Sequence, residues 1–338
     1  QFNKAGSVYA FINEKDPKFR DIKQRLKRAQ AMEETVILGG SGSSKSNASL
    51  VLETGGVQKP MLGRYQVEKE LGKGAMGAVY LGKDPKISRV VAIKTMALSQ
   101  EFEGDELEDV KQRFFLEAET AGRLSHPNIV TIYDAGEEHD LAYIAMEFLQ
   151  GKDLTKYVKP DTLLPIPRIL SIVGRAAEAL NYAHSQNVVH RDIKPANMMY
   201  EPKSDALKIT DFGIARITDS SKTKTGMVLG TPSYMSPEQL AGKKVDGRSD
   251  LFSLGVMLFQ LVTGRLPFQG DSMATLMYKI ANEQHPAAET IRPDLPRCIS
   301  IIINRALAKD REKRYQNGAQ MASDIRKCAQ IIAQMKKA

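Results

Sequence analysis

A short segment near the middle of the sequence, from His190 to Asn197, gathers side chains that can move a proton and hold a metal ion. Asp192 is a carboxylate that can accept or orient the proton of an attacking hydroxyl. Lys194 follows two positions later and can neutralise negative charge on a group in transfer. Asn197 offers an amide oxygen of the kind that hard divalent cations bind. Together these side chains supply what the transfer of a phosphoryl group requires.

A second aspartate extends the same chemistry. Asp211 opens the tripeptide Asp211-Phe212-Gly213 and comes nineteen residues after Asp192. It directly follows the alternating segment Leu207 to Thr210, which predicts a strand. A carboxylate at the end of that strand can bridge Mg²⁺ to the β- and γ-phosphates of a nucleotide.

The glycine-rich segment Gly72 to Gly77 has the pattern GxGxxG, which alone fits a dinucleotide-binding turn or a plain glycine-rich hairpin equally well. A dinucleotide-binding turn runs from a strand into a helix, with an acidic residue about 20 positions later. Here Ala78 to Tyr80 returns as a strand. We therefore expect a hairpin flap whose backbone, free of bulky side chains, can lie over phosphates.

Lys94 lies at the end of the third predicted strand, where on its own it is most simply a solvated lysine. Glu117 lies downstream on a predicted helix. An ion pair between Lys94 and Glu117 would hold the ammonium against the α- and β-phosphates of a nucleotide. The two residues together therefore strengthen the phosphoryl-transfer interpretation.

The elements that must position these residues fall into two groups. Alternating, β-branched segments predict an antiparallel sheet in the first group, and apolar positions at helical spacing predict mostly helices after Gly151. The predicted strands are 65–71, 78–83, 89–96, 129–133 and 141–148, with a helix carrying Phe114, Phe115, Leu116, Ala118 and Ala121. The predicted later helices are 169–184, 251–263, 273–281 and 301–308. The sequence thus indicates a small β-rich part followed by a larger α-rich part.

Composition narrows the class of protein. The chain has 338 residues, 42% hydrophobic and 26% charged, enough for one large core or two joined by a cleft. Cys298 and Cys328 are too few for a disulfide framework, so we expect two small buried hydrophobes in a reducing, cytoplasmic setting. No apolar run is long enough to span a bilayer. The net charge of +8 gathers at the chain ends without interleaved aromatic residues, which argues against nucleic-acid binding.

The sequence predicts four segments: a basic amphipathic helix at 1–35, a flexible Gly/Ser-containing linker at 36–62, the main domain at 63–330 and a basic tail at 331–338. The chain begins with Gln1, so we expect a piece of a longer polypeptide. The basic helix could lie on an anionic membrane, at its cytoplasmic face, or pack on another part of the parent. Thr35 could dock a phosphothreonine-reading partner, and the alternative is an unmodified helix end.

These motifs carry a family resemblance. From about Gly63 to Gln330 the sequence resembles the eukaryotic-type protein kinase family, and its wording is most similar to the bacterial serine/threonine members. The resemblance implies an α+β bilobal protein-kinase fold, with a small antiparallel β-rich N-lobe at 63–149 and a larger, mainly α C-lobe at 150–330. It also implies ATP with Mg²⁺, or Mn²⁺ in its place, and serine or threonine hydroxyls of proteins as acceptors.

The resemblance assigns the site residues. The implied catalytic residues are Asp192, Lys194, Lys94, Glu117 and Thr231, the last supporting Asp192 and Lys194. The implied nucleotide-binding residues are Leu71, Gly72, Lys73, Gly74, Ala75, Met76, Gly77, Val79, Ala92, Lys94, Met146, Glu147, Leu149, Asp153, Asn197 and Asp211. Within that set, Asn197 and Asp211 are the metal ligands. The family also implies that Glu238 pairs with Arg314 and that Asp250 anchors the backbone of the catalytic loop.

Two features concern the acceptor and its control. Lys194 and the stretch 230–238 resemble the serine/threonine rather than the tyrosine members. Arg191 precedes the catalytic aspartate and suits capture of a phosphate. We therefore expect autophosphorylation at Thr223 and Thr225, within a dimer acting in trans, and the alternative is that both are plain polar loop residues.

Two other functions were weighed. A pseudokinase that only scaffolds partners predicts a broken site, whereas every catalytic residue type is present here. A small-molecule kinase of similar fold is the other alternative. Arg191 and the stretch 231–238 argue against it, since both fit a peptide lying against a phosphorylated loop.

Overall fold

The computed structural model describes residues 60–74, 77–138, 141–212 and 232–335. The chain divides into two compact units, one comprising residues 1–103 with 135–148 and the other residues 104–134 with 149–338. Each unit combines two separate stretches of the chain, whereas each predicted lobe is one continuous stretch. The predicted domain boundaries stay a prediction. The following predicted features lie outside the described residues: the 1–35 helix with Thr35, the linker before residue 60, Ala75, Met76, Gly213, Thr223, Thr225, Thr231 and the end of the tail.

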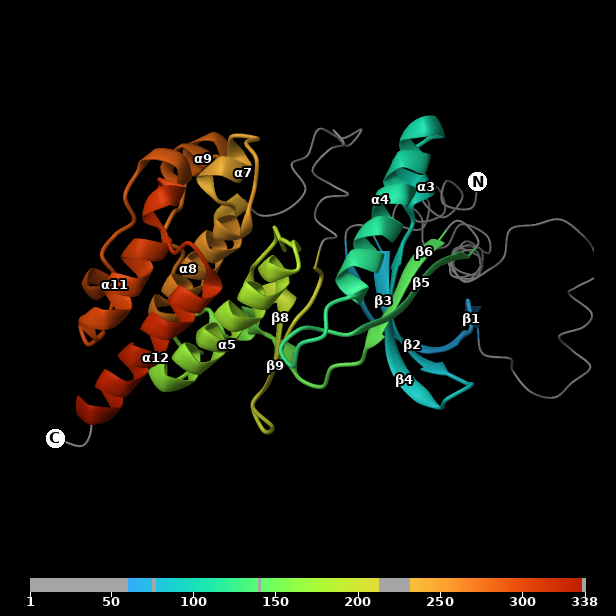
Figure 1. The fold of residues 1–338 in the computed structure, drawn as a ribbon, viewed down its shortest axis with the longest axis horizontal. Coiled ribbons are helices and arrows are strands. Elements are labelled where there is room, and N and C mark those ends of the chain that lie inside the picture. Colours follow the sequence, from blue (N-terminus) through green and yellow to red (C-terminus); the bar gives the residue numbers. More distant parts are fainter. Residues whose placement is uncertain (1–59, 75–76, 139–140, 213–231, 336–338) are drawn as a thin grey trace, which may run out of the picture. The chain divides into compact units, whose positions relative to one another are not determined.

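An antiparallel sheet forms most of the first unit (Figure 1). Its strands are β1 (Met61–Leu62), β2 (Tyr65–Gly74), β3 (Gly77–Asp84), β4 (Arg89–Met96), β5 (Ile132–Glu138) and β6 (Leu141–Glu147), in the order β1-β2-β3-β4-β6-β5. Burial alternates along β3, so one face of the strand is covered. Tyr65, Ile93 and Ala145 are fully buried in this unit. A single turn, α3 (Leu98–Glu101), follows the fourth strand.

Helices dominate the second unit. The longer ones are α4 (Gly104–Gly122), α5 (Ile166–Ser185), α8 (Gly247–Thr263), α9 (Met273–Asn282), α11 (Arg297–Ala306) and α12 (Gly318–Met335). Short ones are α7 (Pro237–Leu240) and α10 (Ala288–Ile291), with 3₁₀ turns η1 (Leu154–Tyr157), η2 (Pro195–Asn197), η3 (Pro232–Tyr234) and η4 (Arg311–Lys313). The α+β class, with a small antiparallel β lobe and a larger helical lobe, is confirmed.

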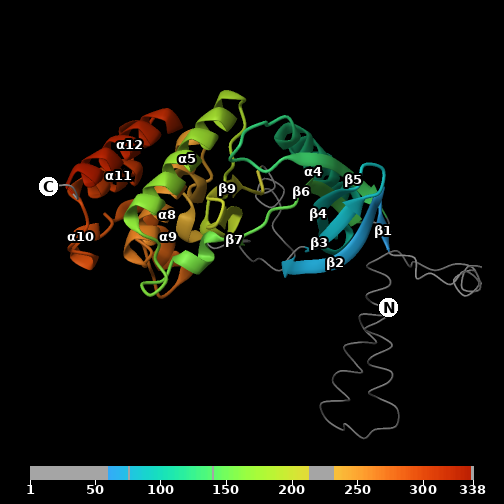
Figure 2. The ribbon, with the colours of Figure 1, turned by 90° about the horizontal axis from the view of Figure 1, so that it is seen from below.

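Helix α8 is the centre of the second unit. Asp246 caps its start by accepting a hydrogen bond from the Arg248 backbone N–H, and Gly264, in the left-handed conformation, ends it. Every residue from Ser249 to Thr263 is buried, as expected for a helix surrounded by others. Helix α5 packs against both α8 and α12, as the views in Figure 1 and Figure 2 agree.

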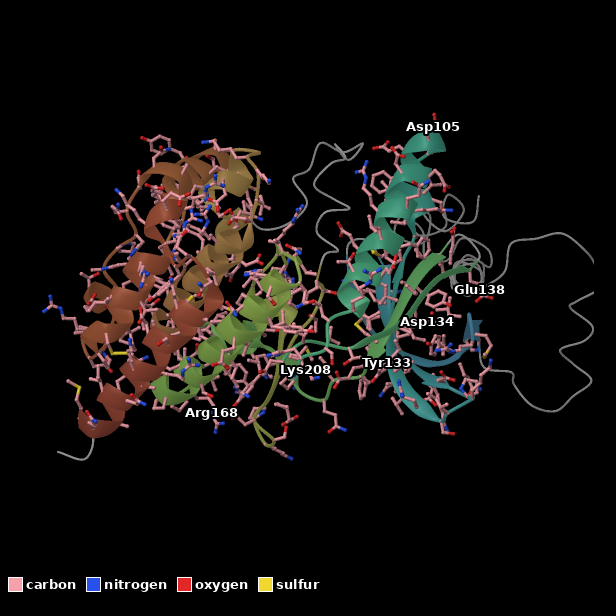
Figure 3. All side chains as sticks on the ribbon, viewed as in Figure 1. Asp105, Tyr133, Asp134, Glu138, Arg168 and Lys208 are labelled. Carbon is pink, nitrogen blue, oxygen red and sulfur yellow. A yellow bond between two sulfur atoms is a disulfide. The ribbon has the colours of Figure 1, made fainter. Side chains whose placement is uncertain are left out.

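A small sheet, β7 (Lys152–Asp153), β8 (Met198–Glu201) and β9 (Ala206–Ile209), lies in the same unit. The β8–β9 turn is joined to α5 by two ion pairs. Asp205, in the turn, lies 2.7 Å from Arg168 and 3.1 Å from Arg175, both on α5. Arg168 is in the first turn of α5 and is labelled in Figure 3. These contacts fix the hairpin that directly follows the segment His190 to Asn197.

Two expectations are corrected. Cys298 and Cys328 were expected to be unpaired, but they form a disulfide between α11 and α12, where the two Cα atoms lie 5.5 Å apart. The segment 129–133 was expected to be one strand, but Ile129 forms an isolated parallel bridge with Ile209 and β5 begins only at Ile132. Among the described residues, no helix combines the length and apolar character needed to cross a bilayer.

Candidate active site

The carboxylate of Asp192 is held by two neighbours in its own loop. Lys194 Nζ lies 2.7 Å from Asp192 Oδ2. Asn197 Nδ2 donates to the same oxygen at 2.9 Å and to the Asp192 carbonyl at 2.8 Å. Pro195 begins the 3₁₀ turn that brings Asn197 back, because its fixed φ suits a first helical position. The side chain of Asp192 stays 37% exposed, so it is oriented yet open to a substrate.

The backbone of this loop is hydrogen-bonded to the buried carboxylate of Asp250 on α8. Asp250 Oδ2 accepts the His190 N–H at 2.8 Å and Oδ1 accepts the Arg191 N–H at 2.7 Å. His184 Nε2, at the end of α5, lies 2.8 Å from Oδ2. Burial alone would raise the pKa of Asp250, but these hydrogen bonds and the nearby imidazoles hold it below its ordinary value. The expected anchoring role of Asp250 is confirmed.

His190 links the catalytic loop to the strand that precedes Asp211. Its Nδ1 accepts the Asp192 N–H at 3.2 Å, and its Nε2 lies 2.8 Å from the Thr210 carbonyl. A neutral imidazole with the proton on Nε2 satisfies both contacts. The ring also meets Phe212 edge-on, with the centroids 4.5 Å apart. His190 therefore braces the loop rather than facing a reacting group.

The two residues predicted to bind a metal, Asn197 and Asp211, lie in segments that a backbone hydrogen bond joins. The Thr210 N–H donates to the Asn197 carbonyl at 3.0 Å, which brings Asp211 next to Asn197. Since Asn197 gives its Nδ2 to Asp192, its Oδ1 is the atom left for a cation. Carboxylate and amide oxygens suit Mg²⁺, which takes its other ligands from phosphates and water. Within the described residues no group of three His, Cys, Asp or Glu side chains is arranged to hold a metal.

Arg191 and Asp211 both have a backbone that is unusual for residues with side chains. Their φ angles are +68° and +62°, in the left-handed region. Such conformations cost about 1–3 kcal/mol and persist only where the surroundings enforce them. Here the surroundings are the Asp250 contacts for Arg191 and the buried Phe212 after Asp211. The loop and Asp211 are thus held in place at an energetic cost.

Two residues that the sequence did not indicate complete this support. One is His184, described above. The other is Gln239 on α7, whose Nε2 donates to the Arg191 carbonyl at 2.8 Å. Its Oε1 accepts the Ser236 N–H at 3.0 Å, forming a capping box that starts the helix. The Ser236 to Gln239 spacing is a local capping-box pattern, but no local pattern marks the contacts with Asp250 and Arg191, which lie 66 and 48 positions away.

The expected pair of Glu238 and Arg314 is present and buried. Arg314 donates two hydrogen bonds to the carboxylate, at 2.6 Å and 2.8 Å, and Ser249 donates a third at 2.5 Å. Burial would raise the pKa of Glu238, but the bonds from Arg314 and Ser249 lower it to about 2. This pair joins α7 to the segment that follows η4.

The glycine-rich hairpin belongs to the first unit. Gly72 pairs with Val79 and Gly74 with Gly77, so strands flank the turn on both sides, as expected. A Cβ on Gly77 would lie 1.7 Å from the Thr95 carbonyl oxygen, so only glycine fits there. Thr95 Oγ1 also bonds to both the N–H and the carbonyl of Ala78. Leu71 lies in a bulge of β2 and is exposed, and Lys73 Nζ is 3.5 Å from Glu70.

Four of the predicted nucleotide-binding residues share one face of this sheet. Val79 is directly opposite Lys94, and Ala92 is directly opposite Met146, in adjacent antiparallel strands. Residues opposite one another, and residues two apart on a strand, point to the same side. The face therefore carries Val79, Ala92, Lys94 and Met146. Glu147 ends β6 beside them in sequence, opposite Val91.

The remaining predicted residues are placed separately. Asp153 caps η1 by accepting the Thr155 N–H at 2.9 Å, and Leu149 is half-buried just before it in sequence. Glu117 is half-buried on α4, in the second unit, while Lys94 is in the first. The ion pair between these two residues stays a prediction.

Comparisons with known proteins all match protein kinases. A model described as the protein kinase domain matches residues 65–327. The chain is similar to serine/threonine-protein kinase PrkC of Bacillus subtilis, with 39% identity over 271 residues, 80% of this chain and 41% of that protein. It is 38% identical to serine/threonine-protein kinase PknB of Mycolicibacterium smegmatis over 271 residues, 78% of this chain and 42% of that protein.

A third relative is serine/threonine-protein kinase pkn3 of Myxococcus xanthus, 40% identical over 265 residues, 75% of this chain and 48% of that protein. The chain thus spans less than half the length of these relatives. What it shares with them is the kinase domain.

Proposed function

The chain belongs to the protein kinase family, and we propose that it transfers the γ-phosphoryl group of ATP to serine or threonine hydroxyls of proteins. The names of its relatives support that type of acceptor. The observation that carries the proposal is the Asp192 carboxylate, which Lys194 and Asn197 both hold on a loop anchored by Asp250. A scaffold with a broken site has no use for this arrangement.

The loop geometry supports a separate task for each side chain. Because Lys194 and Asn197 both contact Asp192 Oδ2, Oδ1 is the oxygen that would orient the acceptor hydroxyl and take its proton. A positioned carboxylate of this kind contributes about 10²–10⁴-fold to the rate. Lys194 would neutralise charge on the phosphoryl group as it moves, and Thr231 would support both residues. The acceptor oxygen would form a bond to the γ-phosphorus of ATP. The bond from that phosphorus to the oxygen bridging the β- and γ-phosphates would break, and ADP would leave.

Metal binding would fall to Asn197 Oδ1 and the Asp211 carboxylate. When bound, Mg²⁺ neutralises the charge of the β- and γ-phosphates, and Mn²⁺ suits the same oxygen ligands. The glycine hairpin, Leu71 to Gly77, would lie over the phosphates. Val79, Ala92 and Met146 would pack against the adenine, with hinge hydrogen bonds from the backbone of Glu147 and Leu149. Asp153 would contact the ribose, and Glu117 would hold Lys94 against the α- and β-phosphates.

Control and partners extend the proposal. Arg191 would capture phosphate on Thr223 and Thr225, added in trans within a dimer. The basic segment at 1–35 would bind an anionic membrane at its cytoplasmic face, and phosphorylated Thr35 would dock a phosphothreonine-reading protein.

The test is incubation of the full chain and a generic acceptor protein with Mg-ATP, followed by phosphosite mapping by mass spectrometry. We expect phosphate on serine and threonine of both proteins, with Thr223 and Thr225 among the sites, and a loss of at least 100-fold in the Asp192→Asn variant. Asp271→Asn, which neutralises an exposed aspartate outside the loop, serves as the control. Equal phosphate incorporation by wild type and Asp192→Asn would overturn the proposal.

A further inference from the structure

A cavity of about 500 Å³ opens on the second unit, away from the catalytic loop itself. Its walls are α7, the end of α9 and the segment that leads into η4. Six charged side chains line it: Glu238, Lys243, Lys244, Lys309, Asp310 and Arg311. A space of this size takes a small ligand or one side chain of a peptide with its neighbours.

The acidic groups in the lining already have partners. Glu238 is bound by Arg314 and Ser249, and Asp310 accepts the Glu312 N–H at 3.0 Å as the cap of η4. Both carboxylates keep their negative charge, but both accept hydrogen bonds from the protein's own donors, and the basic side chains of the lining outnumber them by four to two. The cavity therefore favours a ligand that brings negative charge.

The basic groups are held more loosely. Lys243 and Lys244 are exposed at the mouth of the cavity. Arg311 reaches Asp246 and Glu312 only at 3.7 Å, because Arg248 binds the same two carboxylates at 2.9 Å. An incoming anion can thus recruit all three cations without breaking a short ion pair.

Lys309 is the innermost cation. Its Nζ donates to the Ile280 carbonyl at 2.6 Å and to the Lys279 carbonyl at 3.3 Å, and it lies 3.8 Å from the centre of the Phe268 ring. Burial, with Arg314 nearby, lowers the pKa of Lys309 to about 8. A negative ligand in the cavity would favour the charged ammonium and so gain from this partly desolvated site.

The cavity shares a short helix with the catalytic loop. Pro237, Glu238 and Ala241 face the cavity, while Gln239, in the same turns, donates to the Arg191 carbonyl. A ligand bound in the cavity would lie beside α7, which supports the loop through the hydrogen bond from Gln239 to Arg191. A segment of a protein substrate bound in the cavity could therefore hold another part of the substrate near Asp192.

We propose that this cavity is a docking site for a phosphorylated side chain of a protein substrate, so that a protein already phosphorylated once is held for a second transfer. This inference rests on the proposed function, whose products are such phosphate monoesters. Four basic against two acidic lining residues leave a surplus of two positive charges, which matches the charge of about −1.5 to −2 on a phosphate monoester. A carboxylate would bring only one charge and two oxygens.

The test measures binding first. A short, fluorescently labelled glycine- and alanine-rich peptide with one central phosphothreonine is titrated with the full chain, and fluorescence anisotropy is recorded. The same peptide with threonine or glutamate at that position, and inorganic phosphate as a competitor, form the comparison. The variant is Lys243→Ala/Lys244→Ala, since both lysines are exposed. Its matched control is Lys203→Ala/Lys327→Ala, which removes two exposed lysines outside the lining.

We expect the phosphopeptide to bind at least tenfold more tightly than either comparison peptide, and the Lys243→Ala/Lys244→Ala variant to lose at least tenfold in affinity while the control variant does not. Equal binding of the phosphopeptide by wild type and variant would overturn the proposal. Inorganic phosphate competing as tightly as the phosphopeptide would also overturn it, since the site would then bind free phosphate.

Transfer to an unphosphorylated generic acceptor is measured in parallel. That activity should be the same in wild type and variant, because the cavity takes no part in it. If the phosphopeptide binds but no phosphate is transferred to the acceptor, only the proposed function is contradicted. If phosphate is transferred but the phosphopeptide does not bind, only the docking site is contradicted.

Discussion

Two buried carboxylates in the second unit are used in different ways. Asp250 is 1% exposed and binds two backbone N–H groups and an imidazole, whereas Glu238 is 7% exposed and binds the guanidinium of Arg314. The first places a loop, and the second joins segments 76 residues apart. A buried negative charge can thus define the position of a backbone or neutralise another charge, and the two roles should respond differently to mutation.

The largest expected effect comes from breaking the ion pair. Glu238→Ala leaves Arg314 buried without its carboxylate, which should cost about 3–5 kcal/mol in the free energy of unfolding. Urea unfolding followed by circular dichroism measures it. Glu312→Ala, which removes an exposed partner of Arg248, is the control and should change stability by no more than about 1 kcal/mol. Equal losses in the two variants would contradict the structural role of the pair.

Acid should weaken the same pair. The pKa of Glu238 is about 2 in the folded chain against an ordinary value of 4.5, so its contribution is complete above pH 4.5 and is lost as the pH falls toward 2. The shift corresponds to roughly 3 kcal/mol. Urea unfolding at a series of pH values, compared between wild type and Glu238→Gln, isolates this contribution. Two curves that stay parallel below pH 4.5 would contradict the assignment.

Asp250→Asn should cost about 2 kcal/mol of stability, because an amide N–H₂ would face groups that are themselves donors. Its effect on activity should be larger, about 10- to 100-fold in kcat, since the backbone that carries Asp192 would shift. Peptide phosphorylation and urea unfolding on the same preparations measure both. A variant that loses stability but keeps full kcat would show that Asp250, like Glu238, is only structural.

The smallest effect is expected at Gln239. Gln239→Ala removes one hydrogen bond to the Arg191 carbonyl and half of a capping box, which together should cost about 1 kcal/mol. The Gln239→Glu variant keeps the acceptor for the Ser236 N–H but loses the donor to Arg191. If Gln239→Glu is as stable as wild type yet slower in kcat, the contact to the loop is the functional half. A kcat equal to that of wild type in both variants would mean that Gln239 only starts the helix.

Local patterns predicted local geometry well. Strand β4 was predicted at 89–96 and has those bounds, because alternation and β-branched residues act within the strand itself. Asp192, Lys194 and Asn197 were predicted to share one site, and they do meet, because they lie only two and five residues apart in one turn. The β2–β3 hairpin followed in the same way from its glycines.

Contacts between distant segments were predictable only where the family resemblance supplied them, as for Glu238 with Arg314. Ile129 looked like part of a strand, yet its partner is Ile209, 80 positions later. Cys298 and Cys328 were assigned as unpaired because their spacing does not reveal that α11 and α12 pack side by side. The contacts of His184 with Asp250 and of Gln239 with Arg191 gave no signal, because they exist only in the fold.

The attachment of the catalytic loop to α8 has a consequence for how the loop opens. Loops commonly exchange their amide hydrogens through small local fluctuations, whereas core helices exchange only when much of a domain unfolds. The amides of His190 and Arg191 are bonded to a carboxylate on the most deeply buried helix described in this chain. Their release is therefore tied to the unfolding of that core, so the part-exposed Asp192 sits on a backbone as persistent as that of an interior residue.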